Sequence, residues 1–265
     1  MDKKVITKPI IQAAVIMAIF YVAEIILVYA VVIPDKVLLW AIDSLLRTLL
    51  GVAGLVLLKK HSDAGESKFT VKELFTNRIP AGTWLVLIPF LIYILLPFVN
   101  AFNADYFTTE LIAALSVLIL QQFATGFYEE GVQRGLMMNG LIKYNTATVK
   151  QRLFTVVITG LFFGLGHVPN IVFGENPLVQ APACMMTGMF FAAVYMLSDN
   201  LLLVMLLHAL GDSTTRIVNY LFAYSRDTAL YLFVDRARDV IDYAILPLVA
   251  IYICVAYDRL KKKNV

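Results

Sequence analysis

The sequence predicts an all-α integral membrane protein, a bundle of about eight transmembrane helices. Hydrophobic residues make up 60% of the 265 residues and charged residues only 15%. The mean hydropathy of +0.78 lies far outside the range of soluble domains. The apolar residues also gather in runs close to the roughly 20 residues that a helix needs to cross a bilayer. Soluble fold classes are therefore excluded.

Eight stretches have the length and apolar character of a membrane span. They are residues 9–33, 37–58, 83–102, 118–142, 153–174, 180–197, 200–222 and 240–257. The apolar run of the first stretch, about 25 residues, is too long for the core of a signal peptide, so we expect a retained anchor. The sequence shows no internal repeat and no separate soluble domain. We therefore expect a single integral membrane domain over residues 1–265.

Basic residues gather at alternate ends of these spans. They precede the first span, lie between spans two and three and between spans four and five, and end the chain: Lys3, Lys4, Lys8, Lys59, Lys60, Lys68, Lys72, Arg78, Lys143, Lys150, Arg152, Arg259, Lys261, Lys262 and Lys263. An even number of spans with both termini in the cytoplasm satisfies the positive-inside rule. The loops with Asp105, Glu110 and Glu175 lack basic residues and fit the outer face. The loop after span seven mixes charges and fits less well.

The net charge of +3 is small, and the basic residues flank spans. Anionic lipid headgroups are the expected partners of these residues, and nothing indicates nucleic-acid binding. Cys184 and Cys254 both lie in apolar spans, so we expect packing residues and no disulfide. The short chain has no organelle-targeting peptide, which favours a prokaryotic cell membrane.

Two adjacent acids, Glu129 and Glu130, lie within the span 118–142. A carboxylate in hydrocarbon must be paired, hydrated or protonated, so it usually has a function. On a helix Glu130 and Arg134 are one turn apart and can form an ion pair. Glu129 points about 100° away and is expected to face the bundle interior, where it can act as a base. The alternative is a purely architectural charge cluster.

A histidine follows an aromatic residue by one helical turn in the fifth span, as Phe163 and His167. Gly160 and Gly164 have the spacing of a small-residue packing face, which lets another helix approach closely and bring a carboxylate near His167. Pro169 is expected to perturb the end of this helix. The alternative role for His167 is a hydrogen-bonding bridge between helices.

The seventh span contains His208 and Asp212 on one helix face. At this spacing the carboxylate can orient and polarise the imidazole. An acid and two imidazoles at membrane depth together indicate proton chemistry on a water molecule.

The order Glu-Glu-x-x-x-Arg, Phe-x-x-x-His and His-x-x-x-Asp resembles the CAAX protease and bacteriocin-processing (CPBP, Abi) family of glutamic intramembrane endopeptidases. The resemblance covers residues 118–215, including the connection 195–200. It implies a base at Glu129 that activates water, held or polarised by His167, and an oxyanion stabilised by His208 and Asp212. Glu130, Arg134 and Phe163 are implied to be supporting residues. Many family members carry Asn where this chain has Asp212, so Asp212 is either protonated or orients His208.

The resemblance implies hydrolysis of a peptide bond in a membrane-associated peptide or protein, without a cofactor. Prenylated C-terminal motifs, leader peptides and peptide precursors are candidate substrates, and prenylated ones are less expected in a prokaryote. A zinc site built from Glu129, His167 and His208 is an alternative, although no His-Glu-x-x-His signature is present. The sequence does not indicate an oligomeric state.

A non-enzymatic protein is the alternative from another class. Intramembrane ionisable residues also mark ion pathways in transporters, and a partner-binding scaffold can retain such residues for packing. Glu24, Asp43 and Arg47 add charge to the first two spans. Asp43 and Arg47 are expected to pair within their helix. Glu24 is expected to face Arg47 or the site.

Overall fold

A computed structural model describes residues 3–31, 33, 35–98, 109–221 and 229–262. These residues form helices and the turns between them, with no strand in the described ranges. The expected outer loop with Asp105 lies outside the described residues, and so do residues 222–228, the end of predicted span seven and the start of the loop after it.

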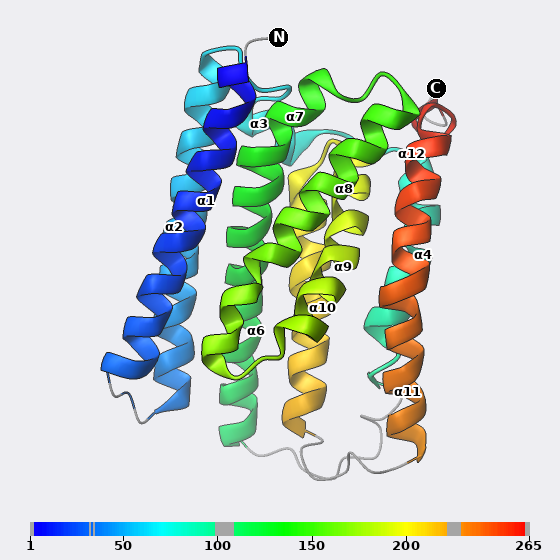
Figure 1. Cartoon of the computed structure of the whole chain (residues 1–265). Helices are drawn as coiled ribbons and strands as arrows, with labels where there is room; N and C mark the ends of the chain where they lie inside the picture. The colour runs from blue at the N-terminus through cyan, green and yellow to red at the C-terminus, as the bar shows by residue number, and fades with distance from the viewer. Residues whose placement is uncertain (1–2, 32, 34, 99–108, 222–228, 263–265) are drawn as a thin grey trace.

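The helices run roughly along one direction and form a single bundle (Figure 1). Their bounds are α1 (Lys3–Ile25), η1 (Ile26–Ala30), α2 (Lys36–Asp63), α3 (Val71–Thr76), α4 (Ala81–Leu95), α6 (Thr109–Glu130), η2 (Gly131–Met138), α7 (Asn139–Tyr144), α8 (Val149–Gly166), η3 (Val168–Phe173), α9 (Pro177–Ser198), α10 (Leu201–Leu221), α11 (Ala229–Val240), η4 (Ile241–Ile245) and α12 (Leu246–Lys262). In Figure 1, α1 and α2 lie at one edge, α4, α11 and α12 at the other, and α6, α8, α9 and α10 between them. The start of α1 and the end of α12 lie at the same end of the bundle.

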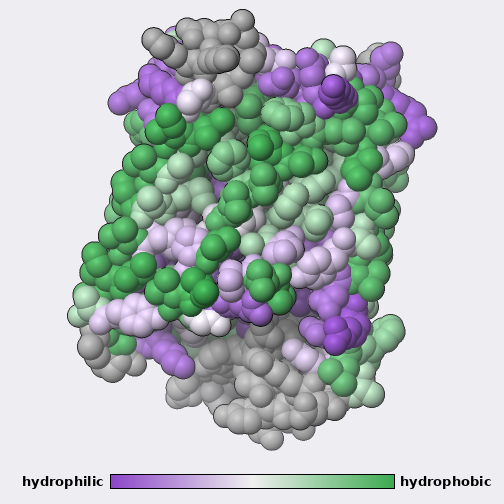
Figure 2. All heavy atoms as spheres, viewed as in Figure 1, coloured by the Kyte–Doolittle hydropathy of each residue, from purple (hydrophilic) through white to green (hydrophobic). Residues whose placement is uncertain are grey.

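Six continuous helical segments in the described part of the chain are long and apolar enough to cross a membrane: Thr7–Ala30, Lys36–Asp63, Ile112–Tyr144, Val149–Phe173, Pro177–Ser198 and Ala229–Lys262. At the predicted span 83–102 the structure has a shorter apolar helix, α4, and residues 99–102 lie outside the described ranges. The predicted span 200–222 coincides with α10, which has 21 residues. On the face shown in Figure 2, an apolar band crosses the bundle, with polar residues above and below it. The predicted all-α polytopic membrane fold is confirmed.

The interior of the bundle is organised around the second half of α9. Every residue of α9 from Gly188 to Ser198 is buried. Phe190, Phe191 and Tyr195 are among the largest side chains there that are fully enclosed. Large apolar residues of α1, such as Ile19 and Val22, are in contrast more than half exposed, as expected of a face that meets lipid.

Glycines allow α8 to pack directly against α9. A Cβ atom on Gly160 would lie 2.4 Å from Met189 Cγ, and one on Gly164 would lie 2.5 Å from the carbonyl oxygen of Ala181. The predicted close approach is therefore confirmed. Its partner is α9, which does not supply the carboxylate nearest to His167.

The helix that carries the two adjacent glutamates changes its form directly after them. α6 ends at Glu130, and residues Gly131–Met138 continue as a π-helix, η2, in which every residue is buried. The apolar pattern predicts one regular span over 118–142, so the change of helix form is a difference from the prediction. Short π-helical stretches occur frequently at functional sites because they redirect side chains without breaking the helix.

A compact polar cluster closes the end of the bundle where α12 ends. Asp199, between α9 and α10, has a left-handed backbone with φ of 52°. Its carboxylate pairs with Lys68 at 3.3 Å through one oxygen and with Lys261 through the other. The side chain of Asn77 donates to the carbonyl oxygen of Asp199 at 2.9 Å. This cluster, here called the turn cluster, joins α10 to the α2–α4 connection and to α12.

Candidate active site

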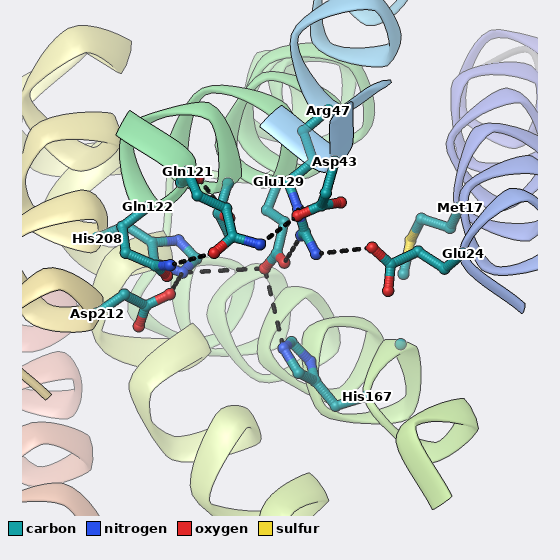
Figure 3. A network of polar contacts seen from close by, with 12 residues as sticks. Met17, Glu24, Asp43, Arg47, Gln121, Gln122, Glu129, His167, His208 and Asp212 are labelled. Carbon is teal, nitrogen blue, oxygen red and sulfur yellow. Dashed lines mark hydrogen bonds and ion pairs between the residues drawn. The ribbon is translucent and has the colours of Figure 1, made fainter. Parts of the chain in front are cut away.

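The three predicted motifs converge on one cavity of about 400 Å³ inside the bundle. α6, α8 and α10 contribute motif residues to its wall, and α1 and α2 contribute further charged residues. The charged and imidazole side chains in the wall include Glu24, Arg47, Glu129, His167, His208 and Asp212. Figure 3 shows these side chains directed toward one another from separate helices.

Glu129 lies between the two imidazoles. Its Oε2 atom is 3.9 Å from Nε2 of His167 and 3.9 Å from Nε2 of His208. The side chain is 16% exposed. Oε2 is buried and has no hydrogen-bond partner among the described residues. A buried carboxylate oxygen without a partner is unusual, because burial without a hydrogen bond is costly. This position agrees with the prediction that Glu129 faces the bundle interior.

The end of α8 determines how His167 faces the cavity. His167 is the C-cap of α8, and Pro169 follows in the 3₁₀ helix η3, so the predicted perturbation of this helix end is present. Nδ1 of His167 lies 2.8 Å from the carbonyl oxygen of Phe163. A carbonyl oxygen only accepts, so Nδ1 carries a proton in this contact. Nε2 is then the ring nitrogen that remains available toward Glu129.

Glu130 has the partner that the sequence predicted and a second one that it did not. Nη1 of Arg134 donates to Oε1 of Glu130 at 3.1 Å, and Nη2 donates to the carbonyl oxygen of Gly188 at 2.9 Å. Oε1 of Glu130 also lies 2.8 Å from Nδ1 of His208. The side chains of Glu130 and Arg134 are fully buried. The ion pair therefore extends from α6 and η2 to the histidine of α10.

Aromatic rings fill the space around this buried pair. Cζ of Arg134 lies 4.6 Å from the ring centroid of Phe163, a cation–π contact. The ring of Phe163 is 4.8 Å from that of His167 and 5.7 Å from that of His208. Phe191 stacks on His208 at 5.4 Å. Phe163 is therefore in contact with both imidazoles, and Phe191 is in contact with that of His208.

Asp212 lies beside His208 as the one-turn spacing predicted. Its Oδ2 atom is 3.4 Å from Nε2 of His208. The side chain of Asp212 is 43% exposed, far more than that of Glu129. His208 thus faces Glu130 with Nδ1, and both Glu129 and Asp212 with Nε2.

A comparison with known families matches the part of the chain that contains these residues. Residues 111–214 match the family model of the type II CAAX prenyl endopeptidase Rce1-like proteins. This segment is similar to that family, and it is called the Rce1-like domain below. The matched segment contains Glu129, His167, His208 and Asp212, and it nearly coincides with the predicted motif region 118–215. The predicted resemblance to the CAAX protease family is thereby confirmed, and the match implies a membrane protease with a membrane-associated substrate. No curated protein and no solved structure matches the chain.

Charged cavity residues also lie outside the Rce1-like domain. Glu24 was expected to face Arg47 or the site, whereas Arg47 was not predicted to belong to the site. Arg47 forms the expected pair with Asp43, with Nε 2.8 Å from Oδ2, and Glu24 also contacts Arg47, at 3.3 Å. Nη1 of Arg47 lies 3.8 Å from Oε1 of Glu129, which places this pair in the site. Neither the one-turn spacing of Asp43 and Arg47 nor the composition of their span indicates which distant helix they face.

Cavity residues inside the Rce1-like domain were also missed, Gln121 and Phe191 among them. Gln121 on α6 donates to Asp43 at 2.6 Å, and Phe191 stacks on His208. The polar Gln121 in an apolar span was an available signal, since polar side chains in spans usually face the bundle interior. Phe191 gave none, because it is one of many aromatic residues in this chain. Among the described residues, no three His, Cys, Asp or Glu side chains are grouped so that they could hold a metal ion.

Proposed function

We propose that the chain is an intramembrane endopeptidase that hydrolyses a peptide bond in membrane-associated peptides or proteins, with Glu129 as the base that activates water. One observation carries this proposal. The unpartnered Oε2 of Glu129 is 3.9 Å from Nε2 of both His167 and His208 inside the cavity. A water molecule placed there can contact the carboxylate and an imidazole together.

The proposed reaction begins with a proton transfer from this water to Glu129. The water oxygen bonds to the carbonyl carbon of the scissile peptide, and the carbonyl electron pair moves onto its oxygen. His167 holds the water through Nε2 while Glu129 takes the proton. When the tetrahedral intermediate collapses, the bond from carbon to nitrogen breaks and Glu129 returns the proton to the leaving amine. One water is consumed, and a carboxyl group and an amine are formed.

His208 is the proposed donor to the oxyanion. With a proton on each ring nitrogen, it donates to Glu130 through Nδ1 and to the oxyanion through Nε2. Asp212, 3.4 Å from Nε2, favours this doubly protonated form by electrostatic attraction. A preorganised donor of this kind typically lowers a barrier by about 3 kcal/mol. Glu130, Arg134 and Phe163 keep the imidazole in place.

The same geometry gives one reason to test for metal. In metal sites a ligating histidine usually donates its other ring N–H to a carbonyl or carboxylate oxygen. Nδ1 of His167 faces a carbonyl oxygen and Nδ1 of His208 faces Glu130. The proposal assigns no metal, so cleavage is expected to persist in a chelator.

The decisive experiment compares wild-type protein with Glu129→Gln in phospholipid vesicles. The substrates are membrane-anchored peptides, including a farnesylated peptide with a C-terminal CAAX motif, its unprenylated form and leader peptides. Glu73→Gln, an exposed acid on α3, is the matched control. We expect Glu129→Gln to lose about 10²- to 10⁴-fold in activity and the control to lose none. Equal cleavage by Glu129→Gln would refute the base, and loss of cleavage in chelator would indicate a metal-dependent protease.

A further inference from the structure

An arginine outside the Rce1-like domain reaches the proposed base. α2 packs closely on α6 and η2 because its glycines carry no side chain that would keep these helices apart. A Cβ atom on Gly51 would lie 2.5 Å from the ring of Phe127, and one on Gly54 would lie 3.0 Å from Val132. Arg47 lies one helical turn before Gly51 on α2 and lines the same cavity as Glu129. The close packing therefore brings a guanidinium group to the site.

Each nitrogen of this guanidinium faces a different carboxylate. Nε donates to both oxygens of Asp43, at 3.0 and 2.8 Å. Nη2 is 3.3 Å from Glu24, and Nη1 is 3.8 Å from Oε1 of Glu129. The ring of Phe20 covers the group, with Cζ of Arg47 at 4.5 Å from its centroid. The Arg47 side chain is 14% exposed, so solvent screens these contacts only weakly.

The groups that hold Arg47 are themselves fixed to α6. Nε2 of Gln121 donates to Oδ2 of Asp43 at 2.6 Å, and Nε2 of Gln122 donates to the side-chain oxygen of Gln121 at 3.2 Å. Figure 3 shows this chain of contacts running from α1 and α2 to Glu129. Contacts from α1, α2 and α6 therefore determine the position of Arg47 together. The ion pair with Asp43 is only one of them.

The two oxygens of Glu129 consequently have different neighbours. Oε1 lies toward Arg47, and Oε2 lies toward His167 and His208. We propose that Arg47 is a positioning residue that orients the Glu129 carboxylate so that Oε2 is presented to the attacking water. This proposal rests on the proposed function, because it assigns Arg47 a role in the same reaction. The planar guanidinium reaches three carboxylates at once, whereas the ammonium of lysine is a single point charge.

The kinetic experiment uses Arg47→Gln, Arg47→Lys and a control, Arg236→Gln, on a farnesylated CAAX peptide in phospholipid vesicles. Arg236 has an 80% exposed side chain and pairs only with Asp239 among the described residues. We expect Arg47→Gln to lower kcat about 10- to 100-fold with KM within about twofold, since small misplacement of a catalytic group has effects of this size. Arg47→Lys recovers only part of this loss, and the control keeps wild-type kcat. A wild-type kcat for Arg47→Gln, or a change confined to KM, overturns the proposal.

Added guanidinium provides a second measurement if Arg47→Gln is poorly folded. In Arg47→Ala the cavity gains space for a free guanidinium ion, which should restore kcat saturably. Ammonium at the same concentration should not restore it, because ammonium lacks the planar fork. Equal rescue by both ions overturns the positioning role.

A measurement without substrate separates this proposal from the proposed function. The carboxylate bands of Glu129 are identified by infrared difference spectra of wild type against Glu129→Gln. We expect the same bands to shift in the Arg47→Gln background, and unchanged bands overturn the contact. Full activity of Glu129→Gln would instead refute Glu129 as the base. The infrared result would still test whether Arg47 contacts Glu129.

Discussion

The cavity and the turn cluster are both built from acids and their basic partners, yet they differ in how completely those acids are paired. Asp199 contacts Lys68 with one oxygen and Lys261 with the other. The ionic contacts of Glu129, by contrast, are all between 3.8 and 3.9 Å, and its Oε2 has no hydrogen-bond partner in the described part of the chain.

The difference separates polar groups that hold the fold from polar groups that are available to react. A fully paired acid stabilises the connection between helices and has no remaining capacity for a substrate. A buried acid with an unsatisfied oxygen costs stability. Oε2 of Glu130 also lacks a partner, but of these two glutamates it is Glu129 that lines the cavity, where a substrate can reach it. We therefore expect substitution of Glu129 in the cavity to lower activity and not stability, and substitution of Asp199 in the turn cluster to lower stability and not activity.

The largest expected effect is on activity, in the cavity. Glu129→Gln should lose about 10²- to 10⁴-fold in cleavage rate while its thermal unfolding in detergent stays at or above the wild-type temperature. The unfolding temperature is not expected to fall, because the substitution replaces a buried, charged carboxylate that has an unsatisfied oxygen with a neutral amide. Parallel loss of activity and of folding would show that Glu129 is structural, and the comparison would fail.

The largest expected effect on stability is at the buried pair of Glu130 and Arg134. Arg134→Gln removes the guanidinium partner of the buried Glu130 charge and leaves that charge only its contact with His208, so the variant should destabilise the protein by about 3–5 kcal/mol. The double variant Glu130→Gln with Arg134→Met should recover much of this loss, because no charge is then left unpaired. Thermal and denaturant unfolding of the purified proteins measure the stability of the single and the double variant. An unchanged unfolding temperature for Arg134→Gln contradicts the expected cost.

A smaller effect is expected at the turn cluster. Asp199→Asn removes the two ion pairs and keeps a residue that tolerates the left-handed backbone. The variant should lose about 1 kcal/mol of stability, because partly exposed pairs contribute little, and its kcat should remain that of wild type. A loss of kcat without a loss of stability would place this cluster in the reaction.

The orientation of the bundle in the membrane is tested by chemical labelling, with no measurement of activity or stability. The start of α1 and the end of α12 share the end of the bundle that holds the turn cluster, and we infer that this end faces the cytoplasm. In a background without Cys184 and Cys254, a membrane-impermeant maleimide on intact cells should label Leu178→Cys at the start of α9. It should leave Lys72→Cys on α3 unlabelled until the cells are opened. The reverse pattern would invert the topology.

Sequence alone predicted the contacts that one helical turn determines. Glu130 with Arg134 and His208 with Asp212 share a face of their own helix, so their spacing was sufficient. Packing between helices was harder to predict. The glycine face of α8 meets α9, while the carboxylate near His167 comes from α6. The inclusion of Arg47 in the site likewise depends on which helix α2 packs against, and spacing along the chain does not contain that information.

The π-helix η2 has a consequence for how one helix serves two regions. Before it, Glu129 is directed into the cavity, and after it, Asn139 bonds to the backbone of Phe69 through both its side-chain oxygen and its side-chain nitrogen, at 3.3 and 3.1 Å. Removing one residue from this stretch would turn its two ends by roughly 100° relative to each other. The stretch thus determines how Glu129, at the reactive end of the helix, is rotated about the helix axis relative to Asn139 at the anchored end. Insertions or deletions are therefore expected to be tolerated less here than in regular parts of α6.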